Sequence, residues 1–264
     1  MSEVLSVLNR MAEANGVAEV WGLATRHFAS LGFSRVNYGL AVNRQHRAAV
    51  PPRDRLFLST LGTDFAREYL DSGDYVHSPL YRWAEENEGA CTWDWLYNAL
   101  REGRLTDAEA RSVRQYEAMG IIAGITISFP QHHARSKGAL GLIGDEGLDQ
   151  AAVTAIWRAR ADEIQAVAHM MHLCLSRHPV QAEDPLLTPR QREALEWVAD
   201  GKTMQDVALL MGISPAMVEK HLRLAREALS VETTAQAIAQ AAALNLLFPR
   251  SGLAGTYTKE VGNT

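Results

Sequence analysis

The stretch LTPRQREALEWVADGKTMQDVALLMGISPAMVEKHLRLAREAL, residues 187–229, decides the fold of the C-terminal part of the chain. Three helices are predicted in it, because Thr188, Thr203 and Ser214 each stand where a helix N-cap belongs and apolar residues follow at steps of three and four. Gly212 lies in the short turn between the second and third segments. A turn of about three residues containing glycine is the connection of a helix-turn-helix. The stretch therefore predicts a helix-turn-helix.

A fourth helix is expected from Thr234 to Phe248, with Thr233 as its N-cap, so residues 187–248 form an all-α, four-helix domain. In such a domain the helix after the turn enters the major groove of DNA, and its Lys and Arg side chains contact phosphates or guanine edges. The residues that we expect at the DNA are Thr203, Ser214, Met217, Lys220, His221, Arg223 and Arg226. The helical pattern alone also fits a protein–protein interaction module.

Composition limits the classes of protein to which the chain can belong. Its 264 residues, 47% of them hydrophobic, can bury one large core or two ordinary ones. No apolar run approaches the about 20 residues of a membrane helix, and the N-terminus lacks a signal-peptide pattern, so a cytoplasmic protein without membrane contact is expected. A net charge of −5 argues against binding nucleic acid through bulk basicity. Cys91 and Cys174 have no metal-ligand spacing, so no metal site is expected.

The N-terminal part, residues 1–177, mixes helical and strand patterns. Apolar residues at helical spacing alternate with segments of period two, which predicts an antiparallel sheet with helices packed on its faces. The fold class is thus α+β, with an N-terminal α/β/α sandwich and the C-terminal helical domain. The expected elements are helices at Val17–Leu31, Asp54–Tyr69 and Leu148–Ser176, and strands at Val36–Val42, Ile121–Phe129 and Ala139–Ile143.

Two segments have no periodic pattern. The stretch HPVQAEDP within residues 178–186 is polar and contains two prolines, so we expect a linker between the domains. Residues 249–264 are rich in Gly and Thr, and we expect a disordered tail.

The N-terminal part shows no Ser/His/Asp order, nucleophile motif or metal spacing, so no enzyme is predicted. It does contain many aromatic residues between Phe65 and Tyr97. Aromatic side chains beside a sheet form either ordinary core or the wall of an apolar pocket for a small molecule. Composition does not separate these alternatives.

The C-terminal domain resembles the DNA-binding domain of LuxR-type regulators. The matching elements are Leu187-Thr188-Pro189-Arg190, Leu195, Trp197, Gly201-Lys202-Thr203, Ala208, Ile213-Ser214, Val218, His221 and Leu229. The resemblance implies a homodimer bound to double-stranded DNA at an inverted repeat, with a dimer contact on the helix from Thr234 to Phe248. The family usually has Glu where this chain has Gln191, Thr where it has Met217 and Lys where it has Ala228.

The N-terminal part resembles the domain with which LuxR-type quorum-sensing regulators bind an acyl-homoserine lactone. The residues that correspond to the family's pocket are Phe65, Tyr69, Ser78, Trp93, Gly124, Thr126 and Gly141. At Ser78 the family has an Asp that accepts the ligand's amide N–H. At Gly141 it commonly has a hydroxyl residue that contacts the acyl carbonyl. Both polar contacts are thus changed in this chain.

The resemblance predicts a DNA-binding transcriptional regulator with a divergent lactone pocket and no cofactor. Three alternatives stay open for the pocket: it takes a different small-molecule signal, it is filled by its own side chains and needs no ligand, or it binds a lactone weakly. A second function is also open, in which the chain silences a related LuxR-type regulator by forming a heterodimer with it. The departures at Gln191, Met217 and Ala228 keep this anti-activator role open.

Overall fold

The structure is a computed structural model that describes residues 3–42, 55–62, 65, 69, 73–131, 136–178 and 186–248. Contacts divide the chain into two compact units, residues 1–178 and 179–264, and each unit is described by itself. The described residues do not include segment 179–185 of the expected linker or the expected tail 249–264. Within the described ranges, no helix has the length and apolar character needed to cross a membrane.

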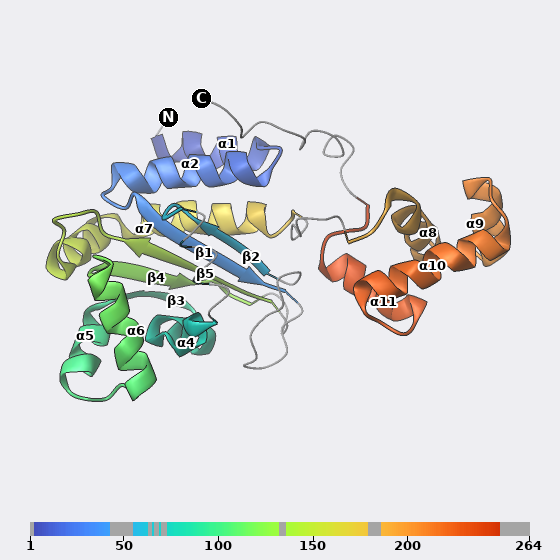
Figure 1. Cartoon of the computed structure of the whole chain (residues 1–264). Coiled ribbons are helices and arrows are strands. Elements are labelled where there is room, and N and C mark those ends of the chain that lie inside the picture. Colours follow the sequence, from blue (N-terminus) through green and yellow to red (C-terminus); the bar gives the residue numbers. More distant parts are fainter. Residues whose placement is uncertain are drawn as a thin grey trace, which may run out of the picture. The chain divides into compact units, whose positions relative to one another are not determined.

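A five-stranded antiparallel sheet forms the centre of the first unit (Figure 1). Its strands lie in the order β2-β1-β5-β4-β3, so the two longest strands, β1 and β5, are neighbours in the middle. Successive side chains of a strand point to opposite faces, and therefore each strand contributes to both layers of the unit. The strands are β1 (Arg35–Ala41), β2 (Arg55–Ser59), β3 (Gly89–Thr92), β4 (Gly124–Ser128) and β5 (Lys137–Ile143).

One face of the sheet is covered by three helices, α1 (Glu3–Glu13), α2 (Val17–Ser30) and α7 (Gln150–Leu175) (Figure 1). The side chains between them and the sheet are almost wholly buried. A polar contact lies within this apolar layer: the Tyr38 hydroxyl is 2.9 Å from His172 Nδ1, and the His172 ring stacks on Phe129. Burial raises the pKa of Tyr38 far above its ordinary value, so its hydroxyl stays protonated.

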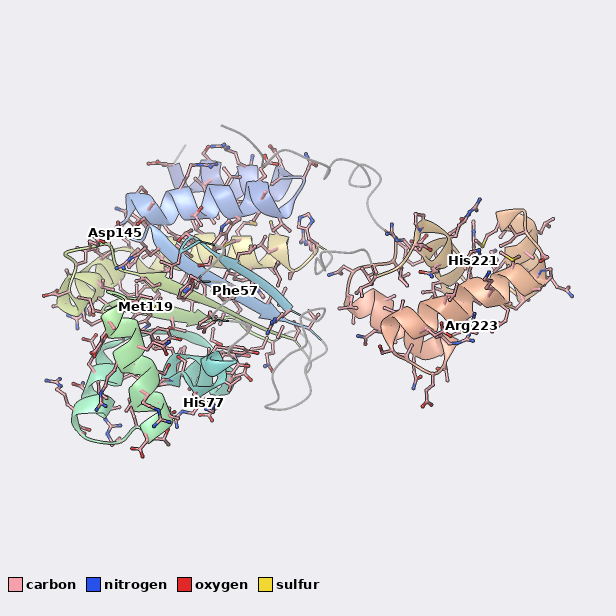
Figure 2. All side chains as sticks on the ribbon, viewed as in Figure 1. Phe57, His77, Met119, Asp145, His221 and Arg223 are labelled. Carbon is pink, nitrogen blue, oxygen red and sulfur yellow. The ribbon has the colours of Figure 1, made fainter. Side chains whose placement is uncertain are left out.

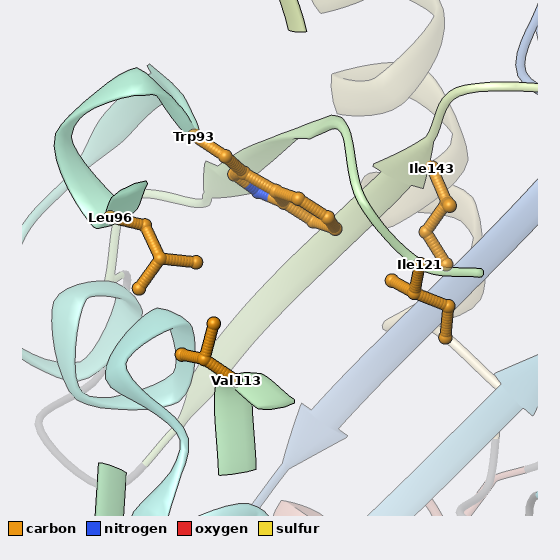
Figure 3. Close-up of a cluster of buried hydrophobic side chains, with 5 residues drawn as sticks. All are labelled: Trp93, Leu96, Val113, Ile121 and Ile143. Atoms are coloured by element: carbon orange, nitrogen blue, oxygen red, sulfur yellow. The ribbon is translucent and has the colours of Figure 1, made fainter. Parts of the chain in front are cut away.

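The other face carries η2 (Asp74–His77), α4 (Pro79–Glu86), α5 (Asp94–Arg101) and α6 (Asp107–Ala118) (Figure 1). A second core joins this layer to the sheet. Figure 3 shows its buried members Trp93, Leu96, Val113, Ile121 and Ile143. The predicted α/β/α sandwich with an antiparallel sheet is confirmed.

One predicted helix of the first unit is wrong. The helix expected over Asp54–Tyr69 begins in the structure as strand β2, Arg55–Ser59, which pairs with β1. Arg55, Phe57 and Ser59 lie on one face of the sheet, and pairing with β1 outweighs the helical spacing of the segment. Phe65 and Tyr69 are helical, as expected.

The described part of the second unit, residues 186–248, contains four helices, α8 (Pro189–Ala199), α9 (Met204–Met211), α10 (Pro215–Leu229) and α11 (Thr234–Ala243). The side chains of Thr188, Thr203, Ser214 and Thr233 cap them, as the sequence predicts. The fourth helix is shorter than expected, because it ends at Ala243 instead of Phe248. Asn245 adopts a left-handed conformation (φ 54°) that stops the helix.

Candidate functional site

A cavity of about 180 Å³ lies on the face of the sheet that carries η2 and α4. Five of the residues predicted for a ligand pocket line it together: Tyr69, Ser78, Trp93, Thr126 and Gly141. These residues come from a helical turn, the start of α4, the start of α5 and two central strands, so the fold gathers segments that are far apart in the sequence. The cavity is a candidate small-molecule site.

Two of the predicted pocket residues support the wall from outside. Phe65 stacks on Tyr69 with ring centroids 5.6 Å apart. Gly124 lies under the Trp93 ring: a Cβ atom there would be 2.7 Å from the ring and 2.6 Å from the Leu142 carbonyl oxygen. Glycine at this position therefore lets the Trp93 ring lie flat against β4.

Trp93 is nearly fully buried, and its indole N–H is already engaged. The Nε1 atom donates a hydrogen bond of 2.9 Å to Thr126 Oγ1. A buried N–H needs a partner, and here the protein supplies it without a ligand. Thr126 also lines the cavity, and its hydroxyl can still donate one hydrogen bond.

Ser78 is 2% exposed and is the N-cap residue of α4, but its side chain forms no cap hydrogen bond. Pro79 at the first helical position has no N–H, and its fixed φ favours the helix start. The Ser78 hydroxyl therefore serves the cavity wall and not the helix. It is a short neutral group, whereas the family has a carboxylate at this place.

Tyrosines form a second part of the wall. Tyr69 stacks on Phe57 and packs against Tyr75, with ring centroids 5.3 and 5.6 Å apart. Burial, and then the neighbouring Tyr116, raise the pKa of Tyr69 well above its ordinary value, so the phenol stays neutral. The Tyr75 hydroxyl is buried and has no hydrogen-bond partner in the part of the chain that the structure describes.

Several wall residues were not predicted from the sequence, among them Asn37 and Tyr116. Strand pairing places Asn37 opposite Gly141, and Gly141 opposite Thr126. A Cβ at Gly141 would have no neighbour nearer than the Asn37 carbonyl oxygen at 3.9 Å, so the site has open space there. Asn37 follows the alternating pattern of its strand, but a strand pattern does not tell which face borders a cavity.

The predicted DNA-binding residues lie on α9 and α10 of the second unit. Thr203 caps α9 in a capping box with Asp206, and Ser214 Oγ accepts the Met217 N–H at the start of α10. Met217 is 40% exposed, and Lys220 is exposed. The start of α10 is thus capped by a side chain and open to solvent.

Two of the three cations on α10 have intramolecular partners. Arg223 pairs with Glu227 one turn later. Arg226 is only 19% exposed: it pairs with Glu219 at 3.0 Å and donates a hydrogen bond to Thr234 Oγ1. Arg226 therefore ties α10 to the start of α11.

The remaining predicted residue of this helix, His221, is half-buried. Figure 2 shows His221 and Arg223 on different sides of α10, as expected for residues two apart at about 3.6 residues per turn. Of the residues predicted for DNA binding on this helix, Met217, Lys220 and Arg223 are exposed.

Comparison with known proteins identifies the family. The family model of the autoinducer binding domain matches residues 16–175, well over half of the chain. The chain belongs to the LuxR-type family of quorum-sensing regulators. A second family model, sigma-70 region 4, matches residues 185–229, the helix-turn-helix stretch.

Curated LuxR-type relatives agree with this assignment. The chain is 30% identical to the quorum sensing-dependent transcriptional regulator RpaR of Rhodopseudomonas palustris over 141 residues, which is 53% of this chain. That match spans just over half of the relative, 55% of its length. The transcriptional activator protein EsaR of Pantoea stewartii is 25% identical over 214 residues, covering 77% of this chain and 84% of EsaR.

The fold is shared with SdiA of Escherichia coli. The two chains are 16% identical with a TM-score of 0.54, and the match covers 93% of this chain and 98% of SdiA. A structure of SdiA in complex with octanoyl-rac-glycerol gives a TM-score of 0.53 at the same identity, covering 91% of this chain and 93% of that one. The likeness to SdiA concerns the fold alone.

Proposed function

We propose that this LuxR-type protein is a DNA-binding transcriptional regulator whose pocket binds a signal other than a standard acyl-homoserine lactone, or works without one. The observation that carries the DNA-binding part is α10, which starts at a Ser214 cap and presents Lys220 and Arg223 to solvent. Helices of this kind enter the major groove N-terminal end first.

Ser78 carries the part of the proposal that concerns the signal. A hydrogen bond to a charged acceptor contributes about 1.5–3 kcal/mol, and a neutral one about 1 kcal/mol. With Ser78 in place of the carboxylate and no side chain at Gly141, a lactone loses much of its polar recognition, by about 2–4 kcal/mol if both contacts are lost. The fold itself tolerates other acyl ligands, since SdiA forms a complex with octanoyl-rac-glycerol.

The DNA-binding part is tested by selection from random DNA with the full chain. We expect a homodimer and an enriched inverted repeat whose half-sites lie about one helical turn, or a multiple of it, apart. Lys220→Ala should weaken binding and reduce the salt slope by about one unit, if Lys220 contacts a phosphate. Arg190→Ala, which removes the same charge from α8, serves as the matched control and should leave the slope unchanged.

The signal is tested by mass spectrometry of small molecules released from the purified, folded protein. We also expect the chain to be soluble when expressed without any lactone, with a melting temperature that lactones raise little. A tight ligand at about 100 times its Kd would stabilise the fold by about 2.7 kcal/mol, which a melt detects readily. A chain that is insoluble alone and strongly stabilised by a common acyl-homoserine lactone would be an ordinary lactone receptor.

The ion pairs of α10 favour a second candidate function, the silencing of a related regulator by heterodimerisation. Glu227 and Glu219 neutralise Arg223 and Arg226, which leaves Lys220 as the cation of this helix without a carboxylate partner among the described residues. If the selection enriches no dyad sequence while the chain abolishes DNA binding by a LuxR-type relative in a mixed dimer, this candidate replaces the first.

A further inference from the structure

The pocket face of the sheet carries two different polar rows. Register pairs Ala41 with Arg55 on one side and with Lys137 on the other, so Arg55 and Lys137 flank one end of the cavity. Four residues back along β1, Asn37 lies in the row that contains Gly141 and Thr126. At about 3.3 Å per residue the two rows are about 13 Å apart.

Side chains between the two rows are mostly apolar. Three members of the intermediate row of the sheet, Gly39, Phe57 and Ala139, line the cavity. The site therefore fits a molecule with an apolar middle about 13 Å long and a polar group at each end. Since an extended chain advances about 1.2 Å per bond, such a molecule has about ten bonds between its ends.

The described residues that line the cavity near Arg55 and Lys137 carry an excess of positive charge. Two cations, Arg55 and Lys137, and one carboxylate, Glu85, line the cavity. Lys137 is nearly buried and donates a hydrogen bond of 2.9 Å to the Asn87 carbonyl oxygen.

Arg55 differs from Lys137 in that the described residues give its guanidinium no partner. It is half-buried, and within the described residues its guanidinium forms no hydrogen bond or ion pair. A half-buried guanidinium without a partner is costly, and a carboxylate is the partner whose two oxygens match its geometry.

We infer that the signal of this pocket is an amphiphile with a carboxylate, which binds at Arg55, and a hydrogen-bonding group at the far end, which reaches the row of Asn37 and Thr126. This inference rests on the proposed function, because it names the chemical class of the ligand in the same site. It distinguishes the pocket from a lactone site, since an acyl-homoserine lactone has no negative charge.

Three probes of equal length separate charge from shape: ω-hydroxydecanoate, the neutral decane-α,ω-diol and the cationic ω-aminodecanol. Their binding to the full chain is measured by isothermal titration calorimetry and by the shift in melting temperature. We expect the carboxylate to bind at least tenfold more tightly than the diol, and the amine to bind more weakly than both.

Variants at Arg55 test whether this residue causes the preference for the carboxylate over the diol. Because β2 is an edge strand and Arg55 is half-exposed, Arg55→Gln should fold, and it should lose the preference for the carboxylate while still binding the diol. Arg55→Lys keeps the positive charge and should therefore retain most of the preference for the carboxylate. Arg158→Gln removes an exposed charge from α7, on the other side of the sheet, and should change nothing.

Two outcomes would overturn the inference. If the diol binds as tightly as the carboxylate, or if Arg55→Gln leaves their ratio unchanged, the pocket takes a neutral signal and the proposed function stands. If none of the probes binds, the inference falls as well, while mass spectrometry of the purified protein still decides separately whether the pocket holds a signal.

Discussion

The two units differ in how many of their helices begin at a side-chain cap. In the C-terminal unit α8, α9, α10 and α11 all start at a Thr or Ser whose hydroxyl accepts a backbone N–H. In the N-terminal unit Thr106 and Asp149 cap α6 and α7, but Gly16, Ser78 and Trp93 precede α2, α4 and α5 without any side-chain cap. Short-range hydrogen bonds thus define the C-terminal helices, whereas packing between distant segments defines most of the N-terminal unit. Substitutions of cap residues should therefore destabilise the C-terminal unit, and substitutions at close contacts between segments should destabilise the N-terminal unit.

The largest effect is expected at Gly124, where two distant segments meet closely. Gly124→Ala places a Cβ 2.6 Å from the Leu142 carbonyl oxygen and 2.7 Å from the Trp93 ring, so strand or ring must move. We expect a loss of about 1–3 kcal/mol in the free energy of unfolding, as for other overpacked cores. Thermal or urea unfolding of the full chain measures it, and the loss should appear in the transition of the N-terminal unit.

Gly141→Ala is the matched control on the neighbouring strand. Its Cβ would meet nothing closer than 3.9 Å, so we expect a change within about 0.5 kcal/mol. Equal losses for the two variants would mean that the Trp93 ring does not lie against β4 as described.

An intermediate effect is expected at the helix caps. Thr188→Ala removes the hydroxyl that accepts the Gln191 N–H, which should cost the C-terminal unit about 1 kcal/mol. Ser78→Ala removes a hydroxyl from an N-cap position that forms no cap bond, so the N-terminal unit should change by less than about 0.5 kcal/mol. A larger loss for Ser78→Ala than for Thr188→Ala in the same unfolding measurement would contradict the contrast between the units.

The smallest effect is a pH dependence confined to the C-terminal unit. Hydrogen bonds from the Thr203 side chain and backbone hold the pKa of Asp206 below its ordinary value of 3.8. A lowered carboxyl pKa stabilises the fold above the ordinary value, and this stabilisation is lost as the pH falls through the folded-state pKa. From about pH 6 to about pH 3 the melting temperature of this unit should fall more in the wild type than in Asp206→Asn. Parallel curves would show that the Asp206 cap does not contribute.

The same contrast explains which parts of the fold sequence reasoning can predict. Thr188, Thr203 and Ser214 act through backbone groups three residues away, so the starts of the C-terminal helices are readable from the sequence. The end of α11 is a left-handed Asn245, a weaker signal than glycine, and its position was predicted too late. In the N-terminal unit β2 was mistaken for helix, because its conformation depends on pairing with β1.

The residues of the candidate pocket also fall into a group that the sequence predicts and a group that it does not. Tyr69, Trp93 and Ser78 could be chosen because they stand in a family pattern, and the structure places them around one cavity. Arg55 and Asn37 could not, because they reach the cavity only through the register of β2, β1 and β5. A charged residue on an edge strand is ordinarily a solvated one, and nothing in its neighbours along the chain indicates otherwise.

The strand order also sets the order in which the protein can fold as it is made. β1 lies between β2 and β5, and β5 is synthesised long after the other two, so the centre of the sheet cannot close until Lys137–Ile143 has left the ribosome. Pairings between distant segments form slowly and leave apolar strand faces exposed in the meantime. The C-terminal helices form mostly local contacts, so they can fold without a segment that is synthesised much later. We therefore expect the nascent N-terminal unit, and not the helix-turn-helix, to be the part of this chain most exposed to aggregation during synthesis.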